Sequence, residues 1–302
     1  MAKIKILCTS TGCIEYAPER YRNLGIGIVR VHMFFKGKEY LEGLDLDPVD
    51  FYRELETLED PKKNLPKTGM PTRAEVTEHF DNAINEGYDE IICYCISSAL
   101  GGTYNEISLI AKDYVDKIKI HVVDTKITCF GEGLLAIKAQ EMVNAGKGSD
   151  EILKESRWMM AHQEFIGMDA KLDYLIYNGR LKGGKAFMGQ MLKICPVIHF
   201  SDAGEIVALE SVRTPKKAIM RTCEIIKEKI GDRSPEDYLL WHVYTGPEYL
   251  EVMKEIEAKC GLSTNHEDVI MSPVSGCHNG PWLAGYGLAL LRREDEPLDD
   301  GE

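Results

Sequence analysis

Apolar and polar positions alternate in two different rhythms through the first half of the chain. Short apolar runs, typical of buried strands, are separated by longer stretches with the 3.6-residue spacing of a helix. We expect strands at Lys3–Cys8, Ile26–Val31, Ile91–Cys95 and Ile118–Val123, and helices at Asp47–Glu56, Thr72–Glu86, Thr103–Val115, Gly131–Asn144 and Ser149–Gln163. This strand–helix–strand order predicts an α/β domain whose mostly parallel sheet has helices on both faces.

The second half follows another pattern, in which two apolar runs flank a tight turn. Ile194–Phe200 and Ile206–Arg213 enclose Asp202-Ala203-Gly204, which is a strong hairpin signal. Further strands are expected at Tyr174–Tyr177, Leu239–Tyr244, Val269–Ser272 and Gly285–Leu291, and helices at Pro215–Lys229 and Pro247–Lys259. We therefore predict an α/β domain over residues 1–165 and a smaller α+β domain with antiparallel strands over 166–293. The acidic tail 294–302 is expected to be disordered.

The chain has 302 residues and a formal net charge of −13 at pH 7. This acidity argues against a general nucleic-acid or anionic-membrane partner, because both need a basic face. No stretch approaches the ~18 uninterrupted apolar residues of a membrane span, and Lys3–Cys8 lacks the long apolar core of a signal peptide. The nine cysteines are scattered. Without a secretion signal, this odd number predicts reduced thiols and a cytoplasmic location.

The segment Ser97-Ser98-Ala99-Leu100-Gly101-Gly102-Thr103-Tyr104 joins a buried strand to a predicted helix. Ligands of open α/β sheets bind beyond the carboxyl ends of the strands, and a helix N-terminus there presents free backbone N–H groups. Two hydroxyls and two glycines would let a carboxylate or phosphate approach closely. The alternative is an ordinary strand-to-helix turn in which Thr103 is the N-cap.

Three other turns carry candidate ligands. In Thr68-Gly69-Met70-Pro71-Thr72, Thr72 is explained as a helix cap, whereas Thr68 has no such structural role. Arg180 lies in a basic, glycine-rich turn, for which a solvated surface turn is the alternative interpretation. His278 stands in a tight turn bounded by glycine and proline, which would fix the direction of its side chain.

In order and spacing, these segments resemble the DegV family of bacterial fatty acid-binding proteins over about residues 3 to 292. The family's Ser-Ser-x-Leu-Ser-Gly-Thr-Tyr motif corresponds to the segment that begins at Ser97, with Gly101 in place of a serine. The family's Thr-Ser-Gln-Pro, Gly-Gly-Arg and late His-x-Gly-Pro motifs correspond to Thr68-Gly69-Met70-Pro71, Asn178-Gly179-Arg180 and His278-Asn279-Gly280-Pro281. Four motifs in the same order are far more specific than any one of them.

The resemblance implies a two-domain protein that holds a long-chain fatty acid in a buried tunnel, with the carboxylate near the seam between the domains. Carried over by position, Thr68 and Ser97 or Ser98 would bind the carboxylate, His278 would lie nearby and Arg180 would lie at the mouth. Family members can present the fatty acid to a separate fatty acid kinase, which forms an acyl phosphate for phospholipid synthesis. The resemblance thus implies a carrier and not an enzyme, with no cofactor other than the bound fatty acid.

Two other functions remain open on the residues alone. Ser97 or Ser98 with His278 and Asp124 has the residue types of a hydrolase triad, although no Gly-x-Ser-x-Gly elbow is present. A metal or thiol site could use Cys277 with His278. No second ligand pair has zinc-like spacing, so no metal is expected.

Overall fold

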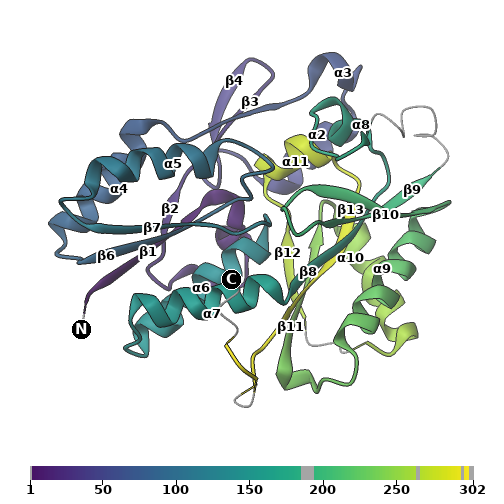
Figure 1. The fold of residues 1–302 in the computed structure, drawn as a ribbon. Coiled ribbons are helices and arrows are strands. Elements are labelled where there is room, and N and C mark those ends of the chain that lie inside the picture. The colour runs from purple at the N-terminus through teal and green to yellow at the C-terminus, as the bar shows by residue number, and fades with distance from the viewer. Residues whose placement is uncertain (1, 185–193, 263–265, 294–295, 299–302) are drawn as a thin grey trace.

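The computed structural model describes residues 2–184, 194–262, 266–293 and 296–298 of the chain. Within these ranges the strands form three sheets (Figure 1). The first has the order β2-β1-β6-β7, and all neighbouring strands in it are parallel. Its strands are β1 (Ile4–Thr9), β2 (Gly27–Val29), β6 (Glu90–Cys95) and β7 (Lys119–Asp124). The predicted parallel sheet is confirmed.

Helices cover both faces of this sheet. Successive side chains of a strand point to opposite faces, and apolar side chains on each face pack against helices. On one face, Leu7 and Ile91 pack with residues of α4 and α5. On the other, Ile6, Ile92 and Tyr94 share a core with α6 and α7. These helices are α4 (Arg73–Asn85), α5 (Thr103–Ala111), α6 (Phe130–Asn144) and α7 (Ser149–Ala161). The expected capping box of Thr72 starts α4.

The second sheet has the order β10-β9-β8-β13-β11-β12 and is antiparallel except at the β11–β12 pair. Its strands are β8 (Gln163–Asp169), β9 (Cys195–Phe200), β10 (Ile206–Val212), β11 (Tyr238–Tyr244), β12 (Glu267–Ile270) and β13 (Leu283–Leu290). The helices α9 (Pro215–Ile230) and α10 (Pro247–Cys260) pack on one of its faces. This matches the predicted α+β character. The expected domain boundary between residues 165 and 166 falls inside β8 and stays a prediction.

A small antiparallel sheet and several short helices lie near the junction of the two larger sheets (Figure 1). The sheet has the order β4-β3-β5, with β3 (His32–Phe35), β4 (Lys38–Leu41) and β5 (Lys67–Gly69). The helices are α1 (Glu19–Arg22), α2 (Pro48–Glu56), α3 (Pro61–Asn64), α8 (Asp173–Tyr177) and α11 (Pro273–Asn279). Because α11 contacts α2, α8 and β5, it ties the two halves of the chain together.

One hydrophobic core continues across the junction. It joins Ile92 and Tyr94 of the parallel sheet to Phe165, Trp241 and Val243 on the inner face of the second sheet. The helix α6 lies between them and contacts β1 and β6 on one side and β8 and β13 on the other. The two halves of the molecule therefore share a buried interface.

Three expectations about elements are wrong. Tyr174–Tyr177 is helical and not a strand, because Gly179 adopts a φ of 68° and closes the short helix α8. The helix expected through Gln163 ends earlier, and β8 begins there as a strand buried between β9 and β13. His278 lies in the last turn of α11 and not in a tight turn, since Ser272 caps a helix whose first residue is a proline.

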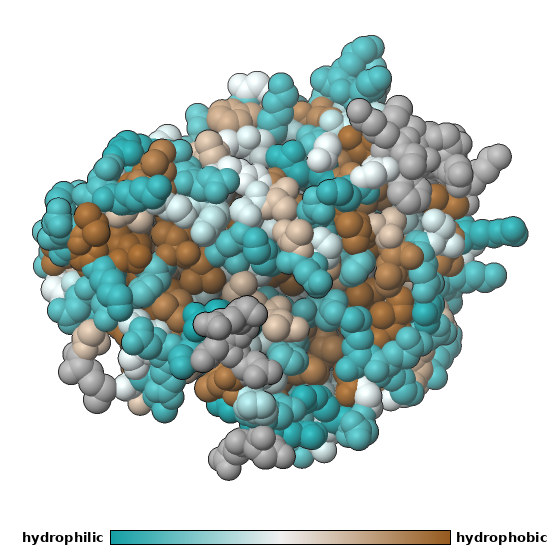
Figure 2. All heavy atoms as spheres, viewed as in Figure 1, coloured by the Kyte–Doolittle hydropathy of each residue, from teal (hydrophilic) through white to brown (hydrophobic). Residues whose placement is uncertain are grey.

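Surface features agree with the composition. No helix in the described ranges is both long and apolar enough to cross a membrane. Hydrophilic side chains cover much of the face seen in Figure 2. All nine cysteines are free thiols, as expected. Of the acidic tail, the structure describes residues 296–298, where Glu296 accepts a hydrogen bond from the backbone N–H of Arg293 at 3.0 Å. The rest of the tail lies outside the described residues, and its disorder stays a prediction.

Candidate functional site

A solvent-connected cavity brings together segments that are far apart in the sequence. Thr68 reaches it from β5, Arg180 from the turn after α8, and His278 from α11. The loop 100–102 and Thr103, the first residue of α5, form another part of its wall. The structure therefore gathers three predicted ligands at one place.

Thr68 and His278 form a hydrogen-bonded pair in this cavity, with Thr68 Oγ1 and His278 Nε2 separated by 3.0 Å. The pair is held by the packing of α11 against β5. His278 Nδ1 is buried and has no hydrogen-bond partner among the described residues. Burial, together with the nearby charge of Arg180, lowers the pKa of His278 to about 3. The imidazole is therefore neutral near pH 7.

The way in which α8 ends determines the position of Arg180. The backbone N–H groups of Gly179 and Arg180 donate to the carbonyl oxygens of Ile176 and Leu175, the pattern of a Schellman motif. Arg180 Nη1 donates to the Asn178 carbonyl at 2.7 Å, whereas Nε is buried without a hydrogen-bond partner in the described chain. Burial lowers the pKa of Arg180. The cavity thus contains a half-buried guanidinium with an unused donor.

Ser97 lies outside this group. Its side chain is fully buried, and its Oγ donates to the Gly204 carbonyl at 2.9 Å. Gly204 has a φ of 77°, and a Cβ there would lie only 2.1 Å from Ser97 Oγ. Ser97 therefore fixes the loop before α5 against the β9–β10 hairpin. It is not among the described residues that line the cavity.

Ser98 is paired with Asp124 at the end of β7. The Ser98 backbone N–H donates to Asp124 Oδ1 at 3.0 Å, and the Ser98 hydroxyl donates to Oδ2. Burial raises the pKa of Asp124, but hydrogen bonds from Lys126 and Ser98 outweigh it and lower the pKa. In the described chain, no hydrogen bond joins His278 to either serine. The residues considered for a hydrolase triad are thus not arranged as one.

The loop before α5 does not follow the alternative interpretation, in which Thr103 caps the helix. The N-cap of α5 is Gly102 and not Thr103, and it makes no side-chain cap. A Cβ on Gly102 would lie 2.5 Å from Met70 Sδ, so this glycine permits close packing against the Thr68 turn. A Cβ on Gly101 would meet no heavy atom within 4 Å. The space beside Gly101 could therefore accept a larger side chain.

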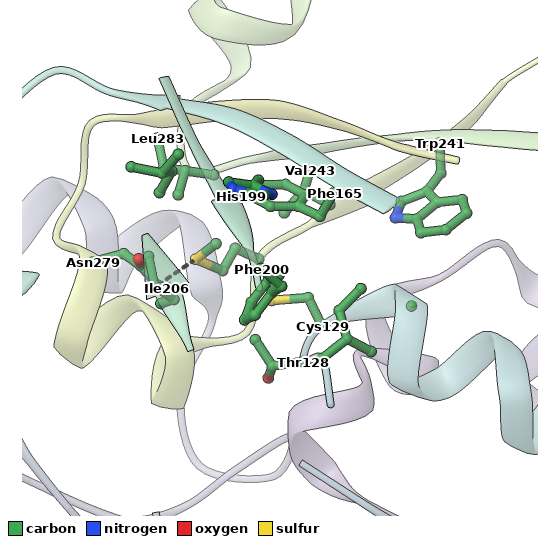
Figure 3. A pocket seen from close by; sticks show the side chains of 14 residues that line it. Thr128, Cys129, Phe165, His199, Phe200, Ile206, Trp241, Val243, Asn279 and Leu283 are labelled. Atoms are coloured by element: carbon green, nitrogen blue, oxygen red, sulfur yellow. Dashed lines mark hydrogen bonds between the residues drawn. The ribbon is translucent and has the colours of Figure 1, made fainter. Parts of the chain in front are cut away.

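A second, narrow cavity adjoins the first and is mostly apolar (Figure 3). Strands of the second sheet supply Phe165, Val243, Trp241 and Leu283, while Thr128 and Cys129 come from the facing loop after β7 (Figure 3). Three residues line both cavities, namely Thr128, Ile206 and Asn279. A polar cavity near the surface and an apolar cavity inside therefore share a wall.

The residues of the apolar cavity were not predicted from the sequence, because most of them are apolar residues of the kind that fill any core. The signal that could have found them is the recurrence of apolar residues at every second position along the strands. Trp241 and Val243 on β11, and Ile198 and Phe200 on β9, point to the same face of the sheet. That face is turned toward the first half of the chain and not toward α9 and α10.

The metal or thiol site at Cys277 is not formed. Cys277 is fully buried, and its neighbour His278 contacts Thr68. In the part of the chain that the structure describes, neither residue belongs to a cluster of three metal-ligating side chains.

Comparison with known proteins gives the family. A family model described as "Uncharacterised protein, DegV family" matches residues 3–290. The chain belongs to the DegV family. Among its DegV relatives, the DegV domain-containing protein lmo2514 of Listeria monocytogenes is 30% identical over 289 residues, which cover 95% of this chain and 99% of that protein.

Solved structures of DegV proteins have the same fold. The fatty acid binding DegV family protein SAG1342 from Streptococcus agalactiae superposes with a TM-score of 0.85 at 27% identity, covering 97% of this chain and all of that one. DegV from Bacillus subtilis, described as a fatty acid binding protein, superposes with a TM-score of 0.81 at 27% identity, covering 96% of this chain and all of that one. The predicted two-part α/β architecture is thus that of the DegV family.

Proposed function

We propose that this DegV protein binds one long-chain fatty acid, with its carboxylate in the polar cavity and its chain in the apolar cavity. The observation that carries this proposal is the unused donor capacity of Arg180 and His278 next to an apolar space. The two DegV structures described as fatty acid binding support the choice of ligand. The shared lining residue Thr128 would mark the passage from one cavity to the other.

The energetics of such a ligand suit the two cavities. Each methylene removed from water contributes about 0.8 kcal/mol, so a long chain supplies ample affinity before ordering costs are subtracted. A buried carboxylate without partners would be very unfavourable. The Arg180 guanidinium would provide charge and a donor, and hydrogen bonds to a charged group are worth about 1.5–3 kcal/mol each.

The Thr68–His278 pair would contribute one further donor. A neutral imidazole carries a single ring proton. With that proton on Nε2, His278 donates to Thr68 Oγ1, and the Thr68 hydroxyl is free to donate to the carboxylate. With the proton on Nδ1, Thr68 donates to Nε2, and Nδ1–H is the donor left without a partner in the described chain. In either tautomer the pair offers one donor, so we place Thr68 and His278 together in the carboxylate site.

Ser97 and Ser98 would act on the loop and not on the ligand in this proposal. Their hydroxyls already donate to the Gly204 carbonyl and to Asp124. By holding the start of this loop, they would place the backbone of Leu100 and Gly101 at the cavity wall. This narrows the expectation from the family motif, in which either serine could bind the carboxylate directly.

We further propose that the protein is a cytoplasmic carrier without catalysis of its own. The polar cavity is the more open of the two, which would leave the carboxylate accessible to a separate fatty acid kinase. Treatment with a fluorophosphonate serine probe checks the alternative. We expect no stoichiometric labelling, and clean labelling at Ser97 or Ser98 would favour a hydrolase.

The direct test of the proposed function is lipid analysis of the purified protein. The protein is expressed in several bacterial hosts, denatured and extracted, and the extract is analysed by mass spectrometry. We expect about one fatty acid per chain. The absence of fatty acid from every preparation, together with no binding when delipidated protein is titrated with palmitate, would reject the proposal.

A further inference from the structure

A second cluster of polar side chains is buried on the other side of the second sheet. It consists of His242 on β11, Glu257 on α10 and His266, which directly precedes β12. Their side chains are only 1%, 3% and 3% exposed. Trp241 and Val243 face the apolar cavity, so His242 between them faces α10 instead. The cluster is therefore separate from the proposed fatty acid site.

Strand register explains why these residues meet. β11 and β12 are parallel neighbours, and His242 is the register partner of Asp268. His266 precedes Asp268 by two positions, which places both on the same side of the strand. Glu257 approaches this face from α10. Three side chains that are distant in sequence thus converge by regular geometry.

Both imidazoles present Nε2 to the same carboxylate oxygen. His266 Nε2 lies 3.7 Å from Glu257 Oε1, and His242 Nε2 is in hydrogen-bond contact with that atom. The two rings are stacked, with centroids 4.7 Å apart and planes inclined by 16°. The ligand atoms of all three residues lie within 4.8 Å of one another. Ligands about 2.1 Å from a tetrahedral metal are about 3.4 Å apart, so a small movement of His242 away from Glu257 would accommodate an ion.

The surroundings of His242 are those of a metal-bound histidine. Its Nδ1 lies 2.6 Å from Asp268 Oδ1, and Lys254 Nζ donates to the other oxygen of Asp268 at 2.8 Å. A carboxylate on Nδ1 fixes the ring orientation and directs Nε2 toward the metal. With an ion bound, the hydrogen bond to Asp268 would hold His242 in the way that outer-shell carboxylates hold the histidines of known metal sites.

We propose that His242, Glu257 and His266 bind one divalent transition-metal ion of the zinc class. Two imidazoles and one carboxylate suit zinc or its neighbours and not magnesium or calcium, which prefer oxygen ligands. All three ligands are buried, so we assign the ion a structural role that links β11, α10 and the start of β12, with water in the fourth coordination position. This departs from the sequence-based expectation of no metal, which considered only ligands with short spacing.

The test uses the full chain, stripped with a chelator and titrated with Zn²⁺ against a chromophoric competitor. We expect one equivalent to bind, and the thermal midpoint to rise with it. Glu257→Gln and His266→Gln should abolish stoichiometric binding, and Asp268→Asn should weaken it about 10- to 100-fold. His32→Gln is the matched control, because His32 also lies between two carboxylates, Glu39 and Glu75, but has no second histidine there.

Two measurements keep the outcome clear if a variant is destabilised. Circular dichroism of each metal-free variant establishes that it is folded. Visible absorption of the Co²⁺ form reports the ligands, and we expect tetrahedral d–d bands without intense near-ultraviolet thiolate bands. The site is overturned if the wild type binds no zinc, if folded His266→Gln binds as well as the wild type, or if thiolate bands place the metal on the cysteines.

Discussion

At the scale of single residues, the proposed carboxylate site depends on donors that the protein itself does not use. Arg180 Nε and His278 Nδ1 are buried without partners in the described chain, whereas the hydroxyls of Ser97 and Ser98 are already bound. The family resemblance placed Thr68, Ser97 or Ser98, and His278 around the carboxylate, with Arg180 at the mouth. The structure brings Thr68, Arg180 and His278 into one cavity, without the two serines. Which hydroxyls remain available could not be read from sequence, because Gly204 and Asp124 reach the serines through tertiary structure.

Replacing Arg180 with glutamine should weaken palmitate binding about 10- to 100-fold, because a charge-assisted hydrogen bond of about 1.5–3 kcal/mol is lost. Isothermal titration measures the effect. Lys182→Gln is the matched control, since Lys182 is exposed, lies two residues away and pairs with Glu205 at 2.7 Å. Equal weakening by both variants would indicate a general charge effect and contradict a specific role for Arg180. The methyl ester of palmitate should bind both variants alike.

Replacing Gly101 with serine should tighten fatty acid binding about two- to tenfold, the value of one added hydrogen bond of about 0.5–1.5 kcal/mol. The loop has room for the new side chain, since a Cβ at Gly101 meets nothing within 4 Å. Gly102→Ser is the control, because a Cβ there would collide with Met70 Sδ. If Gly101→Ser folds normally and binds no more tightly than the wild type, the loop does not face the carboxylate.

At the scale of elements, strong local signals predicted the fold well, and tertiary context decided the rest. The capping box of Thr72 and the Asp202–Gly204 hairpin are found where expected. The segment Tyr174–Tyr177 is helical and not the expected strand. Its four residues are too few to reveal a helical period. The strand β8 was missed since it is buried between two neighbours and lacks a polar face. The helix α11 had a readable signal in Ser272 and the proline after it.

The N-terminus of α11 is held by a buried carboxylate, which makes stability depend on pH. Glu42 accepts from the Val274 N–H at 2.7 Å and from the Tyr16 hydroxyl at 2.6 Å. Burial raises the pKa of Glu42 to about 7, although these hydrogen bonds lower it. The unfolded value is about 4.3. Between the unfolded and folded pKa values, the folded protein therefore keeps a proton on Glu42 that the unfolded chain has lost. The stability that this proton contributes is lost as pH rises from about 4.3 to about 7.

Glu42→Gln should remove this dependence while keeping the size of the side chain. From pH 4 to pH 8, the free energy of unfolding of the wild type should fall relative to that of the variant by on the order of 3 kcal/mol. Urea unfolding of both proteins at several pH values measures the difference. A difference that stays constant, or that rises with pH, would show that Glu42 does not titrate in this range.

At the scale of the whole molecule, the apolar cavity lies between two layers that come from different halves of the chain. One wall is the inner face of the second sheet, and the other is the loop after β7 in the first half (Figure 3). Periodicity predicts which strands have apolar faces, but it does not say which faces are left incompletely filled. The seam between the halves was implied by the family resemblance and not by periodicity, and the cavity within it could not be predicted from the sequence pattern.

Filling this cavity with a larger side chain should weaken the binding of long fatty acids more than the binding of short ones. Val243→Phe places a larger side chain at the inner cavity wall, and each displaced methylene costs about 0.8 kcal/mol, or about fourfold in affinity. We expect palmitate to lose much more affinity than octanoate when both are titrated. Thermal unfolding checks that the variant is folded. Equal losses for the two acids would argue against a chain bound beside Val243.

The most direct test of the central proposal is a crystal structure of the delipidated protein reloaded with palmitate. The account predicts carboxylate oxygens within about 3.2 Å of an Arg180 nitrogen and of Thr68 Oγ1 or His278 Nδ1. It also predicts a chain that passes Thr128 into the apolar cavity. A carboxylate bound instead to the Ser97 or Ser98 hydroxyl, or a chain outside the cavity between the sheets, would contradict it.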